Sequence, residues 1–219
     1  MVYDGIPPGM RPLFWSKCSG YSAYKSNYCD NYYKKLCAAD ESGTLAQYPN
    51  KHFQQIDKDL DRTAPEDPFF TPEIRQSLRR ICRAYVWRNP TVGYCQSMNF
   101  IVFRLRKQLP EEDTFWLFCL IVESYLPPDF YIEMYGAKSY ATILKRIFEQ
   151  YNILPQVLHK FEKEDYPIVA LSCQFFMSLF TNCLPEHASL QVLDLFFLEG
   201  LQSNKIIFDV TLAYLGLLE

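Results

Sequence analysis

The chain has 219 residues, of which 49% are hydrophobic and 16% aromatic, and its formal net charge at pH 7 is −3. This length and apolar content suffice for a buried core and argue against disorder. The slightly acidic charge argues against a basic nucleic-acid-binding face, so we expect no nucleic-acid partner. The start of the sequence has no secretory signal pattern, and no apolar run reaches the roughly 18 residues of a membrane span. We therefore expect a cytoplasmic protein.

Helical signals dominate the first half of the sequence. Pro12 lies where a helix that begins at about residue 11 would have its first turn. Tyrosines at positions 24, 28 and 32 repeat with helical spacing, and loops are expected over 40–50 and 63–72. Thr71-Pro72-Glu73 is a typical helix start, and Asn89-Pro90 should end that helix. Gly93 permits a tight turn, after which we predict a helix from about 94 to 108.

The second half is also predicted to be helical. Pro110 should begin a helix that carries the apolar run 115–122. Later helices are predicted over 138–151, 153–163, 168–182, 187–200 and 203–218. Because alternating strand patterns are scarce, we predict one all-α domain over residues 1–219. The apolar helical pattern continues to the last residues, so we expect the natural domain to extend beyond this end and its C-terminal helices to be missing here.

Eight cysteines are spread along the chain, at positions 18, 29, 37, 82, 95, 119, 173 and 183. The chain is long and rich in core residues, so it has no need of disulfides, and we expect reduced thiols that mostly fill the core. There is no Cys-x-x-Cys pair, and the three histidines lie far apart in the sequence. We therefore expect no zinc site.

Arg62 follows a short acidic segment and precedes a loop with three prolines. One interpretation is a surface ion pair with Asp59 or Asp61, which would contribute little. The other is functional: Asp59, one helical turn earlier, would fix the direction of the guanidinium. Arginine suits the recognition of phosphate because its charge is permanent and its donors form a planar fork.

Gln96 follows the predicted turn at Gly93. One interpretation is a glutamine that caps backbone groups at a helix start. The other is a rigid amide, surrounded by Tyr94, Met98 and Asn99, that positions a water molecule. Such a group must be held firmly, since an error of about 1 Å can reduce a rate roughly a hundredfold. An arginine and a glutamine are the two groups that complete a GTPase active site.

The two segments resemble the Ile-x-x-Asp-x-x-Arg and Tyr-x-Gln motifs of the TBC domain, the catalytic module of Rab GTPase-activating proteins. Here these motifs are Ile56, Asp59 and Arg62, and then Tyr94 and Gln96. Several other segments between residues 5 and 219 resemble family motifs and occur in the family order: Gly5-Ile6-Pro7 with Arg11 and Trp15, Asn89-Pro90 before Gly93, Glu112-Asp113 with Phe115-Trp116, Leu179-Phe180, Leu184-Pro185, and Asp194 with Phe196-Phe197 and Glu199-Gly200.

The resemblance implies an all-helical, multi-helical fold that binds a GTP-loaded Rab GTPase at its switch regions. Arg62 would reach the phosphates and Gln96 would orient the attacking water, both supplied in trans, so the chain would activate a GTPase rather than catalyse a reaction alone. GTP and Mg²⁺ would be carried by the Rab, with no cofactor of the chain's own. Supporting or GTPase-binding roles would fall to the following residues: Asp59, Tyr94, Asn99, Arg11, Trp15 and Asp194.

The same resemblance places the protein in vesicle trafficking, at the periphery of endomembranes, brought near them through the Rab. No Gly-x-x-x-x-Gly-Lys phosphate-binding loop is present, which fits a protein that acts on the nucleotide of another. The alternative function is a catalytically silent Rab-binding scaffold or effector module. The sequence does not identify the Rab or the oligomeric state.

Three positions depart from the family pattern. Ser97 follows the glutamine where the family usually has glycine, and Phe175 and Leu193 stand where it usually has tryptophan. The last two keep an apolar group, so they should affect packing more than chemistry.

Three patterns imitate other functions. The alternating aspartates at 57, 59 and 61 resemble the start of a calcium-binding EF-hand loop, but that loop requires glycine at its sixth position and glutamate at its twelfth, where this chain has Arg62 and Pro68. The arginines at 75, 79, 80, 83 and 88 follow helical spacing and are interpreted as a solvated or ion-paired helix face. Cys95 lacks a nearby histidine that would make it a nucleophile.

Overall fold

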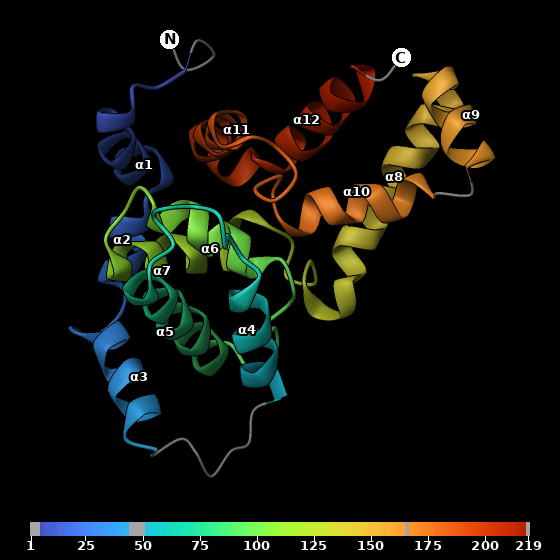
Figure 1. Cartoon of the computed structure of the whole chain (residues 1–219). Helices are drawn as coiled ribbons and strands as arrows, with labels where there is room; N and C mark the ends of the chain where they lie inside the picture. Colours follow the sequence, from blue (N-terminus) through green and yellow to red (C-terminus); the bar gives the residue numbers. More distant parts are fainter. Residues whose placement is uncertain (1–4, 44–50, 165–166, 218–219) are drawn as a thin grey trace. The chain divides into compact units, whose positions relative to one another are not determined.

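The computed structural model describes residues 5–43, 51–164 and 167–217. Within these ranges the chain is α-helical and contains no β-strand, which confirms the predicted fold class. The chain divides into two compact units (Figure 1). We call Pro7–Ser124 the N-terminal unit, and Tyr125 onward, together with Gly5 and Ile6, the C-terminal unit.

The N-terminal unit is built around one long helix, α5 (Pro72–Arg88), which packs against α3, α4, α6 and α7. Its start follows the sequence signal, since the Ile74 N–H donates to the Thr71 hydroxyl at 3.4 Å. The other elements of this unit are η1 (Pro8–Met10), α1 (Arg11–Ser19), α2 (Tyr21–Ser26), α3 (Tyr32–Glu41), α4 (Lys51–Asp61), α6 (Met98–Arg106) and α7 (Glu111–Leu120). The π-helical turn Ile121–Tyr125 follows α7 and ends at the first residue of the C-terminal unit.

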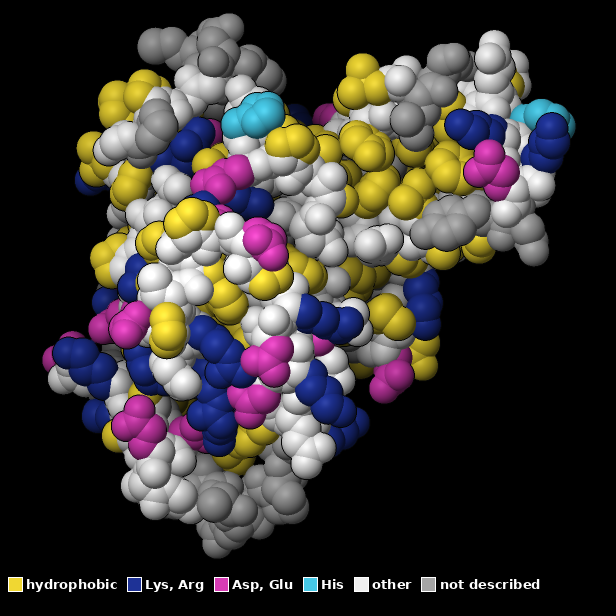
Figure 2. All heavy atoms as spheres, in the orientation of Figure 1, with side chains coloured by type: hydrophobic (Ala, Val, Ile, Leu, Met, Phe, Trp, Pro, Cys, Tyr) yellow, Lys and Arg dark blue, Asp and Glu magenta, His cyan; other side chains and the backbone are white. Residues whose placement is uncertain are grey.

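The arginines of α5 lie among acidic partners, which confirms their interpretation as an ion-paired face. Figure 2 shows basic and acidic side chains interleaved in this region. The pairs, with N–O distances of 2.6–2.8 Å, are Arg75–Asp61, Arg79–Asp57, Arg80–Glu111, Arg83–Asp40 and Arg88–Glu123. Because two of these partners, Asp57 and Asp61, belong to α4, the pairs fasten α4 along α5.

Arg88 also closes an aromatic cluster between α2, α3 and α7. Its guanidinium carbon lies 4.3 Å from the Tyr28 ring centre and within 5.6 Å of the rings of Tyr24, Tyr32 and Trp116. Such cation–π contacts are strongest where the cation is desolvated. Since the Arg88 side chain is only 5% exposed, the cluster joins three helices by both charge and packing.

The C-terminal unit contains η3 (Ile132–Met134), α8 (Tyr135–Tyr151), α9 (Pro155–Lys163), α10 (Ile168–Met177), α11 (Glu186–Glu199), η4 (Gly200–Gln202) and α12 (Asn204–Gly216). Helix α8 packs against α9 and α10, and α12 packs against α10 and α11. The two residues that replace family tryptophans are core residues here: Leu193 is fully buried, and Phe175 packs against Phe180 and Tyr214. They contribute apolar packing, as expected.

Two predicted helix boundaries are wrong and the tyrosine-rich segment is interrupted, each near a residue in the left-handed backbone region. The tyrosine-rich segment is broken between α2 and α3, where Asn31 has φ 60°. The helix predicted from residue 94 begins at Met98, since Ser97 has φ 91°. The helix predicted to reach 182 ends at Met177, just before Leu179 and Phe180, which also have positive φ. αL residues of this kind interrupt helices, and serine, leucine and phenylalanine do not signal them in a sequence as glycine or asparagine can. Most of the loop predicted over 40–50 lies outside the described residues.

All eight cysteines are free, in agreement with the prediction of thiols. The expectation that they mostly fill the core is wrong: only Cys82 and Cys119 are buried, and Cys29 is exposed. None of the helices in the described ranges has the length and apolar character needed to cross a membrane.

Candidate functional site

Arg62 is the first residue after α4. Its backbone N–H donates to the Asp59 carbonyl at 3.2 Å, so the chain makes one tight final turn before it enters the loop. The guanidinium Nη2 binds Asp59 Oδ1 at 2.7 Å, yet 57% of the side chain is exposed. One nitrogen is therefore fixed by an acid while the side chain remains accessible to a partner.

Asp59 is the opposite case, because its side chain is only 1% exposed. A buried carboxylate requires partners, and this one has three donors in the structure. Arg62 Nη2 and Gln55 Nε2 both donate to Oδ1, at 2.7 and 2.8 Å, and the Tyr94 hydroxyl donates to Oδ2 at 3.0 Å. Asp59 thus joins α4, Arg62 and the Gly93–Ser97 segment.

Tyr94 provides the link between the two sequence motifs. It is buried, and its hydroxyl lies 3.0 Å from Asp59 Oδ2 and 3.2 Å from Asn99 Oδ1. Burial, reinforced by the neighbouring Cys82 and Asp59, raises the pKa of Tyr94 well above its ordinary value. The phenol is therefore protonated at neutral pH and can donate to Asp59 Oδ2.

A second chain of hydrogen bonds connects the same segments. The Asn99 amide Nδ2 donates to Thr63 Oγ1 at 2.9 Å, and the Thr63 hydroxyl donates to the Asp59 carbonyl oxygen at 2.8 Å. Asn99 and Thr63 are both buried. Together with the Tyr94 contacts, in which the single phenolic hydrogen faces both Asp59 Oδ2 and Asn99 Oδ1, these contacts link four residues, which we call the buried ring: Asp59, Tyr94, Asn99 and Thr63.

Gln96 is exposed and lies two residues after Tyr94 and three before Asn99. It precedes α6 rather than lying inside a helix, so the expectation of a helical Gln96 is wrong. The backbone around it is fixed: the Met98 N–H donates to the Cys95 carbonyl at 3.1 Å, and Ser97 takes a left-handed conformation with φ 91° and ψ −19°. The amide side chain therefore projects outward from a constrained turn.

Gly93 allows this turn to approach α4 closely. It has φ 63°, and a Cβ at this position would lie 2.3 Å from Nε2 of His52 in α4. Burial, together with the nearby Lys51, lowers the pKa of His52, so the imidazole is neutral at neutral pH. A neutral ring from the helix that leads to Arg62 thus packs directly on the backbone that leads to Gln96.

The remaining predicted site residues, Arg11, Trp15 and Asp194, are not members of the buried ring that contains Asp59 and Tyr94. Arg11 and Trp15 are buried in α1 of the same unit, with 5% and 0% exposure. Asp194 is buried in α11 of the C-terminal unit. The buried ring therefore brings together Asp59, Tyr94 and Asn99, and it places both Arg62 and Gln96 at its edge.

Three residues of the site are not predicted from the sequence: Gln55, His52 and Thr63. Gln55 could have been found from its position four residues before Asp59 on the same helix face. Thr63 directly follows Arg62, but only the tertiary structure shows that its hydroxyl meets Asn99. His52 carries no signal, because its contact depends on the absence of a side chain at Gly93.

The residues whose sequence patterns resemble other functional motifs have structural positions in this fold. Asp57 and Asp61 pair with Arg79 and Arg75 instead of lining a calcium loop. Cys95 is half-buried in the turn before Gln96. Over the described ranges, His, Cys, Asp and Glu form no cluster suited to a metal ion.

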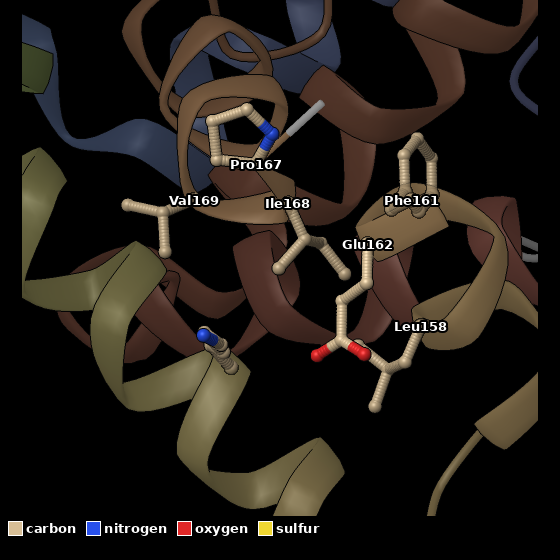
Figure 3. A pocket seen from close by; sticks show the side chains of 7 residues that line it. Leu158, Phe161, Glu162, Pro167, Ile168 and Val169 are labelled. Carbon is tan, nitrogen blue, oxygen red and sulfur yellow. The ribbon is translucent and has the colours of Figure 1, made fainter. Parts of the chain in front are cut away.

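The C-terminal unit contains a separate hollow of about 280 Å³ between α8, α9 and α10. Figure 3 shows apolar side chains around it, among them Leu158, Phe161 and Ile168, with the Glu162 carboxylate at its edge. Lys145 of α8 also lines it. Among the described residues, this lining contains neither an arginine nor a glutamine.

Known proteins resemble this chain in both sequence and fold. The family model described as Rab-GTPase-TBC domain matches residues 8–219. Mouse (Mus musculus) Small G protein signaling modulator 3 is 31% identical over 223 residues, which cover 100% of this chain and 28% of that protein. The crystal structure of the Chlamydomonas flagellar RabGAP TBC domain matches with a TM-score of 0.82 at 31% identity, over 99% of this chain and 69% of that one.

The Ypt/Rab-GAP domain of Gyp1p has the same fold, with a TM-score of 0.71 at 19% identity, over 98% of this chain and 83% of that one. The all-helical fold is thus the one found in Rab GTPase-activating domains. The chain belongs to the Rab-GTPase-TBC domain family. It spans 28% of the length of the mouse relative.

Proposed function

We propose that this chain activates a Rab GTPase by supplying Arg62 and Gln96 to the nucleotide site of the partner. The observation that carries the proposal is that Arg62 and Gln96 are both exposed and that each has sequence neighbours in one buried ring. A single rigid body can thus present a cation and an amide together. GTPase catalysis requires this pair: a cation for the developing phosphoryl charge and an amide to orient the water.

The Arg62 side chain suits the role of an arginine finger. Asp59 engages one of its three guanidinium nitrogens, which sets the direction of the side chain and leaves it 57% exposed. Groups that are oriented before the partner binds lose less conformational freedom on binding. Fingers of this kind accelerate hydrolysis by about 10³–10⁵, equivalent to roughly 4–7 kcal/mol of barrier.

Gln96 is proposed to take the place of the partner's own glutamine. Its neighbours Tyr94 and Asn99 are anchored in the buried ring, which fixes the backbone on both sides of the amide. A water molecule held by this amide would attack the terminal phosphate in line. This role predicts that the chain can stimulate a Rab whose own catalytic glutamine has been removed.

The partner in this proposal is a Rab in its GTP-bound form, and the Rab carries the GTP and Mg²⁺. The chain has no phosphate-binding loop of its own in its sequence. Its place beside endomembranes and its part in vesicle trafficking would follow from the location of that Rab.

The test is a screen of purified Rabs loaded with GTP, in which phosphate release is measured with and without the chain. We expect at least one Rab to hydrolyse GTP 10³-fold faster or more at saturating chain. The same Rab with its catalytic glutamine changed to alanine should remain stimulated by the wild type but not by Gln96→Ala. A chain that binds GTP-loaded Rab and leaves hydrolysis unchanged would instead be a silent binding module.

A further inference from the structure

Thr63 belongs to neither the Ile-x-x-Asp-x-x-Arg motif nor the Tyr-x-Gln motif, yet it is buried beside both. It directly follows Arg62 and is only 7% exposed. Its hydroxyl donates to the Asp59 carbonyl oxygen at 2.8 Å and accepts from Asn99 Nδ2 at 2.9 Å. A hydroxyl can donate one hydrogen bond and accept others, so a single atom fills both roles here.

These two bonds connect the end of α4 with the first turn of α6. Thr63 is adjacent to Arg62, and Asn99 lies three residues after Gln96. The Tyr94–Asp59 bond joins the same two segments at a second point. One link alone would let the segments pivot about it, and the second link restricts that motion.

We propose that Thr63 is a positioning residue, whose hydroxyl keeps the two fingers in register so that they reach a GTPase together. Thr63 acts through Asn99 and the Asp59 backbone, and Arg62 and Gln96 contact the substrate. This inference rests on the proposed function, because register matters only if both fingers act on one nucleotide.

The proposal predicts a loss of rate without a loss of binding. In Thr63→Val the shape of the side chain is kept, but Asn99 Nδ2 loses its acceptor and the link opens. A misplacement of about 1 Å can reduce a rate roughly a hundredfold. We therefore expect the maximal rate of stimulated GTP hydrolysis, at saturating chain, to fall by roughly ten- to a hundredfold. The concentration of chain that gives half of this rate should change less than about twofold, because Arg62 and Gln96 are both retained.

Two matched variants separate register from stability. Thr63→Ser keeps the hydroxyl, so its maximal rate should stay within about threefold of wild type. Thr114 is a second buried threonine of the N-terminal unit, and its hydroxyl donates to the Pro110 carbonyl at 2.9 Å. Thr114→Val should lower the thermal midpoint in a similar way and leave the maximal rate unchanged. An equal loss of rate in Thr114→Val and Thr63→Val would overturn the proposal.

A double-mutant cycle adds a readout that a purely structural role would not change. In a Gln96→Ala background there is no second finger to keep in register, so adding Thr63→Val should lower the remaining rate less than about twofold. If Thr63→Val produces the same fold-loss in both backgrounds, the hydroxyl does not act through Gln96 and the proposal fails.

The possible failures can be told apart. If Arg62→Ala stimulates hydrolysis as well as wild type does, the proposed function itself is wrong. If Arg62→Ala and Gln96→Ala lose activity while Thr63→Val retains it, only the role of Thr63 is wrong. Should Thr63→Val not give the helical circular-dichroism spectrum of wild type, Thr63→Ala replaces it in the same assays. If neither variant folds while Thr63→Ser does, the hydroxyl serves stability and the proposal is overturned.

Discussion

The Tyr94 hydroxyl donates a hydrogen bond of 3.0 Å to Asp59 Oδ2, and this bond joins the two motifs of the candidate site. Asp59 holds Arg62, and Tyr94 lies two residues before Gln96. The two exposed groups therefore share one buried anchor. Each residue of this anchor has an effect that can be measured separately from those of the fingers.

Removing the Tyr94 hydroxyl should affect both stability and rate. Tyr94→Phe leaves the buried Asp59 carboxylate without one donor, which we expect to destabilise the fold by about 1–3 kcal/mol. The stimulated rate of GTP hydrolysis should fall roughly tenfold or more, because the loop that carries Gln96 loses its anchor. Urea unfolding and phosphate release measure the two effects.

The control for this variant is Tyr131→Phe in the C-terminal unit. The Tyr131 hydroxyl is also buried and donates to the Met177 carbonyl at 3.1 Å. This variant should lose comparable stability, of about 1–2 kcal/mol, and retain the stimulated rate. A comparable loss of rate in both variants would show that rate merely follows stability.

The backbone at Ser97 should be strained, since φ 91° is a conformation that L-residues with a Cβ adopt at a cost of roughly 1–2 kcal/mol. Ser97→Gly should therefore stabilise the fold, by about 1 kcal/mol once the greater freedom of glycine in the unfolded chain is included. Ser139, which is exposed inside α8, provides the control. Ser139→Gly should change the free energy of unfolding in the opposite direction and destabilise the fold by roughly 0.5–1 kcal/mol. Urea midpoints check both. A destabilised Ser97→Gly would contradict this reasoning.

Gly93 allows both a tight turn and close packing against the His52 ring. Gly93→Ala should destabilise the fold and slow stimulated hydrolysis, because its Cβ would overlap the His52 ring. Gly20 provides the control, since it also has a positive φ, 74°, but nothing within 4 Å of a Cβ there. Gly20→Ala should lower the free energy of unfolding by only the roughly 1–2 kcal/mol that a positive φ costs alanine, and it should keep the stimulated rate. Equal effects of the two changes on the rate would contradict a special role for the Gly93–His52 contact.

Glu111 should contribute stability that depends on pH. Burial opposes its ionisation, but hydrogen bonds from Arg80 and Tyr33 outweigh burial and lower the pKa of Glu111 below its ordinary value. Because the folded-state pKa is lower than that of the unfolded chain, the contribution is present above about pH 4.3 and is lost as the pH falls through the folded-state pKa.

Glu111→Gln should therefore be less stable than wild type at pH 7, by roughly 1–2 kcal/mol, and the difference should shrink below about pH 4. Urea unfolding at pH 7, 5, 4 and 3 measures this difference. Glu66→Gln, at an exposed loop position, should match wild type throughout. A difference that is constant from pH 7 to pH 3 would contradict the ionic contribution of Glu111.

Much of the fold is predictable from local patterns. The helix beginning at Pro72 is predictable because threonine is a common cap residue and the apolar residues that follow lie on one face, and in the structure Thr71 caps it. The helix predicted through residue 94 was wrong because Ser97 adopts φ 91°, which a serine does not signal. Tertiary contacts decided this boundary, because Asp59 and His52, from a different segment, contact the Gly93–Ser97 turn. Thr63 binds Asn99 in the first turn of α6.

The site was predictable only in part for the same reason. Arg62 and Asp59 lie one turn apart, so their ion pair follows from sequence spacing. The bond from Asn99 to Thr63 joins residues 36 positions apart, and no local pattern indicates it. Sequence can thus suggest the two fingers, but the ring that joins them requires the folded chain.

The most direct test of the central claim is single-turnover GTP hydrolysis by a responsive Rab at saturating chain, with wild type compared with Arg62→Ala and Arg62→Lys. Arg146, an exposed arginine of α8, provides the control Arg146→Ala. We predict that both Arg62 variants bind the GTP-loaded Rab but lose roughly 10³-fold or more of the stimulated rate, while Arg146→Ala retains it. Stimulation by Arg62→Ala equal to that by wild type, for every Rab that responds, would contradict the account.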